Sequence, residues 1–191
     1  HNRGYAYHLL GQPRSGIDDY DHAIQLDPNA ARSYNNRGHA YSDIRQHEEA
    51  TEDFDQAIRL DPEYPLSYHN RGVSYYWLGR YQDAIKDFGD AVRLDPSYCD
   101  AYYKRGHTSA ILGEHCSAIG DYVRAIELAP GYAHLYHSRG VSYYSLGEYH
   151  KAIEDYTLAI ATDPLFVKAY YNRGSSYFAL GLLQHAIADY N

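Results

Sequence analysis

The stretch Tyr34-Asn35-Asn36-Arg37-Gly38-His39-Ala40-Tyr41 decides the fold, because the chain repeats its pattern at a constant interval. The pattern returns at residues 68–75, 102–109, 136–143 and 170–177, and a shortened copy occupies residues 2–7. Successive Arg-Gly glycines, beginning with Gly4, are always 34 residues apart, with no insertion. A constant period of this length is typical of a protein built from stacked structural repeats.

Each period is predicted to form two antiparallel helices. In the repeat at residues 30–63, the first helix has on one face, at the spacing i, i+3, i+4 and i+7, Tyr34, Arg37, Gly38 and Tyr41. The second helix, expected from about residue 48 to residue 60, has at the same spacing Ala50, Asp53, Phe54 and Ala57. In most copies a glycine follows the first helix and Asp-Pro ends the second, as helix ends commonly require.

The predicted fold class is therefore all-α, an α-solenoid of helix-turn-helix repeats with a 34-residue period. Residues 1–191 are expected to form a single array. Its complete repeats are predicted at 30–63, 64–97, 98–131 and 132–165, and its partial repeats at 1–29 and 166–191.

Small and aromatic residues are predicted to fill the space between the two helices of each repeat. Glycine of the first helix and alanine of the second, such as Gly72 and Ala84, are placed where two helices must approach closely. One recurrent core position is expected to hold Tyr20, Phe54, Phe88, Tyr122, Tyr156 and Tyr190.

The pattern resembles the tetratricopeptide repeat (TPR), whose signature is an aromatic residue followed by Leu-Gly, Tyr, Ala, Phe and Pro at fixed offsets. In the third copy the matching residues are Tyr68, Gly72, Tyr75, Ala84, Phe88 and Pro96. The resemblance extends over the whole chain, in an Asn-Arg-Gly variety of the repeat. It implies a right-handed superhelix in which the first helix of each hairpin lines a concave groove.

Arginine stands where the family signature has leucine before the glycine. An arginine on a packed face needs a partner, because an unpaired buried charge is very costly. An aspartate on the packed face of the second helix recurs in every copy, so partly buried ion pairs are predicted, within one repeat or shifted by one repeat. The predicted structural pairs are Arg37 with Asp53, Arg71 with Asp87, Arg105 with Asp121, and Arg139 with Asp155. The alternative is that the arginines face the groove and bind ligand carboxylates.

Composition limits the classes of partner and compartment. The net charge of −8 argues against a nucleic-acid partner, because such affinity comes mainly from basic residues. No apolar stretch approaches the roughly 20 residues that span a bilayer, so no membrane span is expected. Cys99 and Cys116 are expected too far apart for a disulfide, which favours free thiols in a reducing, cytoplasmic setting. No signal peptide is visible, although His1 begins inside a repeat and a targeting segment could have preceded it.

Asparagine is the first of three classes of residue expected to line the groove. It precedes the repeated arginine in most copies, which gives the predicted site residues Asn36, Asn70 and Asn172. An amide offers both a donor and an acceptor, so it can hold a peptide backbone without reading its sequence. The alternative is hydrogen bonding between helices of neighbouring repeats.

Aromatic residues form the second class. Aromatics exposed on a concave surface often mark a binding site, because they bury a large area at little entropic cost. The predicted site residues are Tyr76, Trp77, Tyr103, Tyr144 and Tyr171. Tyrosine is also the common core residue of this chain, so packing between repeats is the alternative for part of this class.

Charged and titratable residues form the third class, with Lys104, His107 and His137 as the predicted site residues. His107 and His137 are expected to face each other across adjacent repeats, and binding could weaken near pH 6 as they become charged. No metal site is predicted, because no fourth ligand is evident. Some TPR adaptors capture a terminal carboxylate with a clamp of lysine and asparagine at fixed positions of the repeat. Here those positions hold Asn35, His39, His69 and Val73, so the clamp is not reproduced and binding of chaperone C-termini is not expected.

The chain carries no Gly-rich phosphate loop, His-Glu-x-x-His motif or Gly-x-Ser-x-Gly motif, so no catalysis and no cofactor is expected. The leading hypothesis is a scaffold that holds a protein or peptide ligand in the groove. One alternative is a substrate-recruiting or regulatory arm of a larger enzyme. Another is a structural array that self-associates head to tail, because neither end shows an atypical polar capping repeat.

Overall fold

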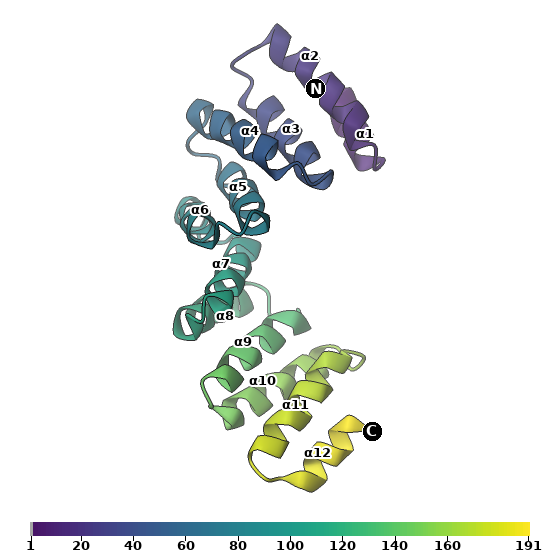
Figure 1. Cartoon of the computed structure of the whole chain (residues 1–191), viewed down its shortest axis with the longest axis vertical. Helices are drawn as coiled ribbons and strands as arrows, with labels where there is room; N and C mark the ends of the chain where they lie inside the picture. Colours follow the sequence, from purple (N-terminus) through teal and green to yellow (C-terminus); the bar gives the residue numbers. More distant parts are fainter. Residues whose placement is uncertain (1) are drawn as a thin grey trace. The chain divides into compact units, whose positions relative to one another are not determined.

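The computed structural model describes residues 2–191 and is all-α. Within this described range the chain forms twelve helices, which pack in consecutive pairs joined by short turns (Figure 1). The predicted fold class of helix-turn-helix repeats is therefore confirmed. The chain divides into two compact units, the N-terminal unit of residues 1–98 and the C-terminal unit of residues 99–191. The prediction of a single array over residues 1–191 stays a prediction.

The N-terminal unit contains three helix pairs. Their bounds are α1 (Asn2–Leu9), α2 (Pro13–Leu26), α3 (Ala31–Asp43), α4 (His47–Leu60), α5 (Pro65–Trp77) and α6 (Tyr81–Leu94). Within each pair the second helix packs on the first, and α2 and α4 also pack on the first helix of the next pair. Each repeat therefore buries part of its apolar surface against the following one, as expected for a unit too small to form its own core.

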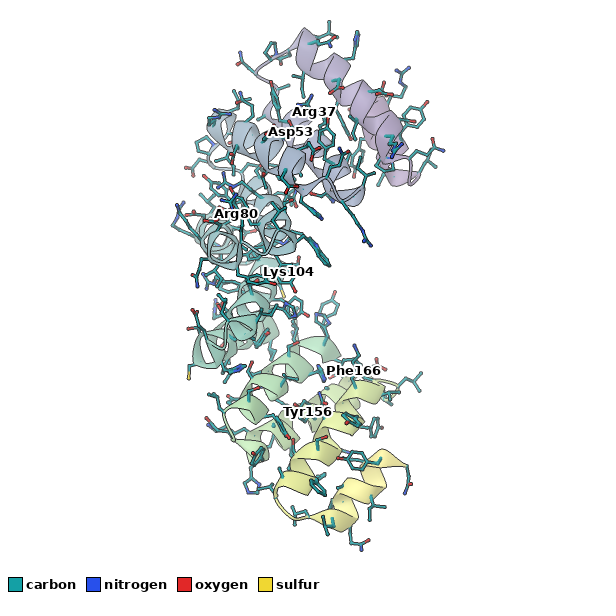
Figure 2. The ribbon with its side chains drawn as sticks, viewed as in Figure 1. Arg37, Asp53, Arg80, Lys104, Tyr156 and Phe166 are labelled. Atoms are coloured by element: carbon teal, nitrogen blue, oxygen red, sulfur yellow. The ribbon has the colours of Figure 1, made fainter. Side chains whose placement is uncertain are left out.

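The C-terminal unit has the same plan. Its helices are α7 (Cys99–Ile111), α8 (His115–Leu128), α9 (Ala133–Ser145), α10 (Tyr149–Thr162), α11 (Val167–Ala179) and α12 (Leu183–Tyr190). Its core cluster of Ala152, Tyr156, Ala159 and Ala169 joins α10 to α11. Phe166, in the turn before α11, packs against this cluster, and Figure 2 labels it near Tyr156.

The repeated glycine of the first helix is required by the close approach of its partner helix. A Cβ atom added to Gly72 would lie 2.9 Å from Cε1 of Phe88, which is fully buried. The aromatic position is buried in five copies but not in the last, where Tyr190 is 49% exposed. The prediction of a shared core position is thus wrong for Tyr190, because in this structure no further helix pair covers α12.

The turn between the two helices of a repeat needs a left-handed residue. Gly79 has φ of +74°, and the corresponding glycines of the other repeats adopt similar values. Arg45 occupies this position in the second repeat with φ of +62°, a conformation that is unfavourable for a residue with a Cβ atom.

The aspartate of the Asp-Pro pairs organises the connection to the next repeat. The carboxylate of Asp95 accepts a hydrogen bond of 2.9 Å from the backbone N–H of Ser97. Asp163 accepts a similar bond of 3.0 Å from the N–H of Leu165. These local bonds turn the chain after the helix and satisfy the backbone N–H group of the residue that follows each proline.

Candidate functional site

The first helices of the pairs form the inner side of each unit. In the N-terminal unit α3 contacts α5, and in the C-terminal unit α9 contacts both α7 and α11. Among the described helices, no comparable contact joins the second helices α8 and α10. Helices that approach one another more closely lie on the inside of a curved stack. We therefore call the solvent-facing side of the first helices the inner face of each unit.

A cavity of about 250 Å³ opens on the inner face of the N-terminal unit. We call it the amide cavity, because three asparagine side chains from α3 and α5 contribute to its wall. The residues that line this cavity include Tyr5, Tyr20, Asn35, Asn36, His39 and Asn70. Two of the predicted groove residues, Asn36 and Asn70, thus lie in one cavity.

The asparagines of this cavity also bond to one another. Asn70 Nδ2 donates to Asn35 Oδ1 at 3.3 Å, and Ser67 Oγ donates to the same oxygen at 3.2 Å. Asn35 Nδ2 lies 3.4 Å from Asn36 Oδ1. The bonds from Asn70 and Ser67 join α5 to α3, so the asparagine column connects neighbouring repeats as well as lining the cavity.

A second cavity, of about 310 Å³, opens on the inner face of the C-terminal unit. We call it the histidine cavity, and its wall includes His107, His115, Tyr122, His137, Val141 and Ser142. His107 of α7 and His137 of α9 therefore share one cavity across adjacent repeats.

The two cavities occupy equivalent places in the repeat. Three periods of 34 residues separate Tyr5 from His107, Tyr20 from Tyr122, Asn35 from His137, and His39 from Val141. The same backbone thus presents three amides and one imidazole, that of His39, in one unit and three imidazoles in the other. The chemical difference between the cavities comes from side chains alone.

The imidazole of His137 is held in its neutral form. Burial, with the positive charge of Lys168 and of His134, lowers the pKa of His137 to about 4. Its Nε2 lies 2.9 Å from Asn172 Nδ2, an amide donor, so this nitrogen is an acceptor. Burial and Lys104 also lower the pKa of His107. Near neutral pH the imidazoles of His107 and His137 are therefore uncharged.

Two buried polar atoms beside the histidine cavity have no hydrogen-bond partner in the described part of the chain. Ser142 is fully buried, and its Oγ has no hydrogen-bond partner among the residues that the structure describes. The buried Nδ1 of His115 is also without a partner there. Neither residue was identified from the sequence. The position of His115 holds residues of different types in the other copies, and the position of Ser142 holds alanine, serine or threonine.

Several predicted aromatic residues lie beside the helix starts rather than in the two cavities. Trp77 is 66% exposed, and its ring stacks on His47 at the start of α4, with centroids 6.2 Å apart. Tyr76 packs edge-on against Trp77 and Tyr81. Tyr144 packs in the same manner against Tyr149, at 5.3 Å.

Tyr103 and Lys104 lie on α7, close to the histidines. The Tyr103 ring is 5.0 Å from that of His134, and Lys104 Nζ is 5.9 Å from the centre of the Tyr103 ring. Figure 2 labels Lys104. Tyr171 of α11 contacts Tyr190 and lines a different cavity, between α11 and α12, of about 760 Å³.

Each repeated arginine forms an ion pair with the aspartate 16 residues later. Arg71 donates from Nε and Nη2 to the two oxygens of Asp87, both at 2.7 Å. The same arrangement joins Arg37 of α3 to Asp53 of α4, and both residues are labelled in Figure 2. The equivalent bidentate pairs are Arg105 with Asp121, Arg139 with Asp155, and Arg173 with Asp189. These arginines therefore have carboxylate partners within the protein.

In the N-terminal unit the same arginines also bond to the preceding repeat. Nη1 of Arg37 donates to Asp21, and Nη1 of Arg71 donates to Asp55. The predicted pairing within a repeat thus occurs, and a second aspartate from outside the predicted column adds a bond across the repeat boundary. The positions that correspond to Asp21 and Asp55 in the later repeats hold Gly89, Val123 and Thr157. Of these side chains only that of Thr157 can accept a bond, and its Oγ1 lies 3.0 Å from Nη1 of Arg173.

Burial and ion pairing act in opposite directions on the aspartates. Burial raises the pKa of Asp87, and the hydrogen bonds from Arg71 oppose this rise. The same balance, with burial first, raises the pKa of Asp53 and of Asp155. The arginines stay charged, so the pairs hold the helices in register at a considerable desolvation cost.

The described residues include no group of three histidine, cysteine, aspartate or glutamate side chains that could hold a metal ion. Both cysteines are free thiols, with Cys116 exposed and Cys99 partly buried. None of the described helices is at once long and apolar enough to cross a membrane.

The sequence matches family models for the tetratricopeptide repeat along most of its length. A model described as "Tetratricopeptide repeat" matches residues 31–64 and 65–98, and another of the same description matches residues 1–30. A model described as "TPR repeat" matches residues 140–181. No curated protein sequence matches the chain.

Solved structures show the same fold. A crystal structure of MamA is 28% identical, with a TM-score of 0.80, and covers 84% of this chain and 94% of its own. YrrB, described as a TPR protein with an unusual peptide-binding site, is 25% identical, with a TM-score of 0.77 and coverage of 89% and 91%. PilF of Pseudomonas aeruginosa, at 16% identity, has a TM-score of 0.84 and coverage of 98% and 86%.

The paired helices, the glycine and aromatic positions between them and the matched family models agree with one another. The chain belongs to the tetratricopeptide repeat family.

Proposed function

We propose that this chain is a non-catalytic protein-interaction scaffold that holds an extended segment of a partner protein against the inner face. The observation that carries the proposal is the recurrence of a cavity at equivalent positions of the two units, about 250 Å³ and 310 Å³ in volume. Each cavity combines aromatic surface with hydrogen-bonding side chains, the combination that orients a peptide ligand.

Similar proteins support this proposal. YrrB, whose similarity extends over 89% of this chain, is described as having an unusual peptide-binding site. The amides of Asn36 and Asn70 and the imidazoles of His107 and His137 line the two cavities and offer donors and acceptors for a partner's backbone or side chains.

Selection from a displayed library of random 12-residue peptides tests the proposal without knowledge of the natural partner. Enriched peptides are then synthesised with a fluorescent label, and their affinity is measured by anisotropy. Val141→Arg and His39→Arg place a long side chain at equivalent points of the two cavities. We expect one or both variants to weaken binding by about tenfold or more, which is about 1.4 kcal/mol.

Leu158→Arg is the matched control, because Leu158 is 45% exposed on α10, a second helix. Its affinity for the peptides should equal that of the wild type, and circular dichroism should show unchanged helix content in all three variants. A library that yields no enriched peptide, or peptides insensitive to both cavity variants, would contradict the proposal.

Self-association is a second candidate, favoured by apolar side chains on α11 and α12. Val167 is 75% exposed, Tyr171 64% and Ile187 53%, beside the cavity of about 760 Å³. A second copy of the chain could cover this surface. Sedimentation at several protein concentrations tests this candidate, with Ile187→Lys as the variant expected to abolish association. A single monomeric species at every concentration would exclude it.

A further inference from the structure

We infer that the inner face of the C-terminal unit binds acidic segments, with a partner's carboxylate at the histidine cavity between Lys104 and Lys168. This inference rests on the proposed function and adds the chemical class of the ligand. Its occupant is a protein segment rich in aspartate or glutamate.

The charges of the first helices carry the inference. In α7, α9 and α11 the only acidic residue is Asp100, although the whole chain has a net charge of −8. Two of the four lysines of the chain, Lys104 and Lys168, lie on these helices. A concave surface lined by one sign of charge concentrates ligands of the opposite sign. An acidic protein with such a surface selects its partner by charge.

Among the described residues, the two lysines have no carboxylate partner within ion-pair distance. The repeated arginines of α7, α9 and α11 are neutralised by Asp121, Asp155 and Asp189. By contrast, neither Lys104 nor Lys168 forms an ion pair in the part of the chain that the structure describes. Lys104, which is partly buried, contacts the Tyr103 ring instead. Both ammonium groups are thus available to a ligand.

Neither lysine lines the wall of the histidine cavity, but the charge of each reaches one of its histidines. The charge of Lys104 disfavours protonation of His107, and the charge of Lys168 disfavours protonation of His137. A carboxylate bound there would offset the two positive charges. It would also accept hydrogen bonds from imidazolium groups, and charge-assisted bonds of this kind are about twice as strong as neutral ones.

Binding should therefore take up protons. The groups around His137 are Lys104, His107 and Asp100 from α7, His115 and Tyr122 from α8, His134 from α9, Tyr156 from α10, and Lys168 and Asn172 from α11. Asp100 is the one carboxylate in this set, and its electrostatic effect is on His134 rather than on His137. A ligand carboxylate would supply the missing negative charge. The affinity for an acidic segment should accordingly rise as the pH falls from 7.5 to 6.0.

The test uses two labelled 12-residue peptides that alternate leucine with either glutamate or glutamine. Anisotropy at 150 mM salt should give an affinity at least about tenfold higher for the glutamate peptide, because only this peptide can form charge-assisted bonds. Lys104→Gln and Lys168→Gln should each reduce that affinity by about threefold to tenfold. Lys151→Gln removes the same charge from a second helix of the same unit and should leave the affinity unchanged.

The variant His137→Asn tests the proton linkage. Residues 35 and 70 already form the corresponding asparagine pair in the N-terminal unit, so the substitution reproduces an arrangement that this fold accepts. We expect it to abolish the rise in affinity between pH 7.5 and pH 6.0.

Equal affinity for the two defined peptides, or equal losses in the Lys104→Gln and Lys151→Gln variants, would overturn the inference. If the random library still yields peptides that Val141→Arg weakens, the proposed function survives that result. If the library yields none, the proposed function fails independently of the charge of the peptide.

Discussion

The amide cavity and the histidine cavity lie at equivalent places in the two units but differ in chemistry. Asn35, Asn36 and Asn70 give the first cavity amides, which stay uncharged at any physiological pH, beside the single imidazole of His39. The second cavity has the three imidazoles of His107, His115 and His137. The difference teaches that a repeat fixes where a cavity lies, whereas a few side chains per repeat fix what the cavity can bind.

The ion pairs differ between the units in a parallel manner. In the N-terminal unit Arg71 bonds to both Asp87 and Asp55. In the C-terminal unit Arg139 bonds to Asp155, and Val123 stands at the position equivalent to Asp55. The two arginines are buried to the same degree, at 18% and 17% side-chain exposure. The two arginines can therefore be compared directly, because the difference between them is the second carboxylate that Arg71 binds.

The largest expected effect comes from removing the aspartate that pairs with each of these two arginines within its repeat. Asp155→Ala leaves Arg139 buried without a carboxylate and should lower the free energy of unfolding by about 3–5 kcal/mol. Asp87→Ala leaves Arg71 with Asp55, so its cost should be smaller by about 1–2 kcal/mol. Urea unfolding followed by circular dichroism measures both. Equal costs would show that the second carboxylate in the N-terminal unit contributes nothing.

A glycine substitution compares a covered with an uncovered repeat. Gly72→Ala forces a methyl group against Phe88, which is fully buried and cannot move away, and should cost about 1–3 kcal/mol. Gly174→Ala presses on Tyr190, a residue that is 49% exposed and whose side chain can turn towards solvent. The second variant should lose less than half as much stability. Thermal unfolding of the two variants tests this, and the reverse order would contradict the packing described here.

The pH dependence of stability should also separate the two cavities. The pKa of His137 is about 4 in the folded chain, below the ordinary value of 6.5. Between these values the unfolded chain binds a proton that the folded chain excludes, so stability is lost as the pH falls from about 6.5 towards 4. The loss should be about 1–3 kcal/mol.

Exchanging residues between the cavities tests that assignment. His137→Asn should make stability less sensitive to acid, and Asn35→His should make it more sensitive. Urea unfolding at pH 7.0 and pH 4.5 measures both changes. An unchanged pH profile in the His137→Asn variant would assign the acid sensitivity to other groups.

The smallest expected effect concerns the turn between α3 and α4. Arg45 has φ of +62°, where other repeats have glycine. Arg45→Gly should therefore stabilise the chain by up to about 1 kcal/mol, because glycine adopts this conformation without strain. The matched substitution Gly79→Ala, at φ of +74°, should destabilise by a similar amount. Thermal unfolding distinguishes the two signs.

The sequence was sufficient to predict the helix pairs, because the spacing of Tyr34, Gly38 and Ala50 repeats without interruption and leaves one consistent packing. It also indicated which charges would pair, since each arginine and the aspartate 16 residues later lie on packed faces. The second carboxylates, Asp21 and Asp55, were missed because they lie outside those faces and act across a repeat boundary.

The cavities were harder to predict, because each depends on side chains from several helices. Asn36 and Asn70 were expected in the groove, but their bonds to neighbouring side chains depend on distances that one helix does not reveal. Trp77 was predicted to lie in the groove because it is the only tryptophan and has no equivalent among the core positions. The structure places its ring on His47, a contact between two repeats that residue spacing within one helix does not encode.

Photo-crosslinking tests the central claim, that the inner face holds the partner segment, most directly. Benzoylphenylalanine is introduced at residue 141, in the histidine cavity, or at residue 158, exposed on α10. Each protein is irradiated with the most enriched library peptide. The account predicts a crosslinked product from position 141 and none from position 158. A product from position 158 alone, or equal yields from both positions, would contradict it.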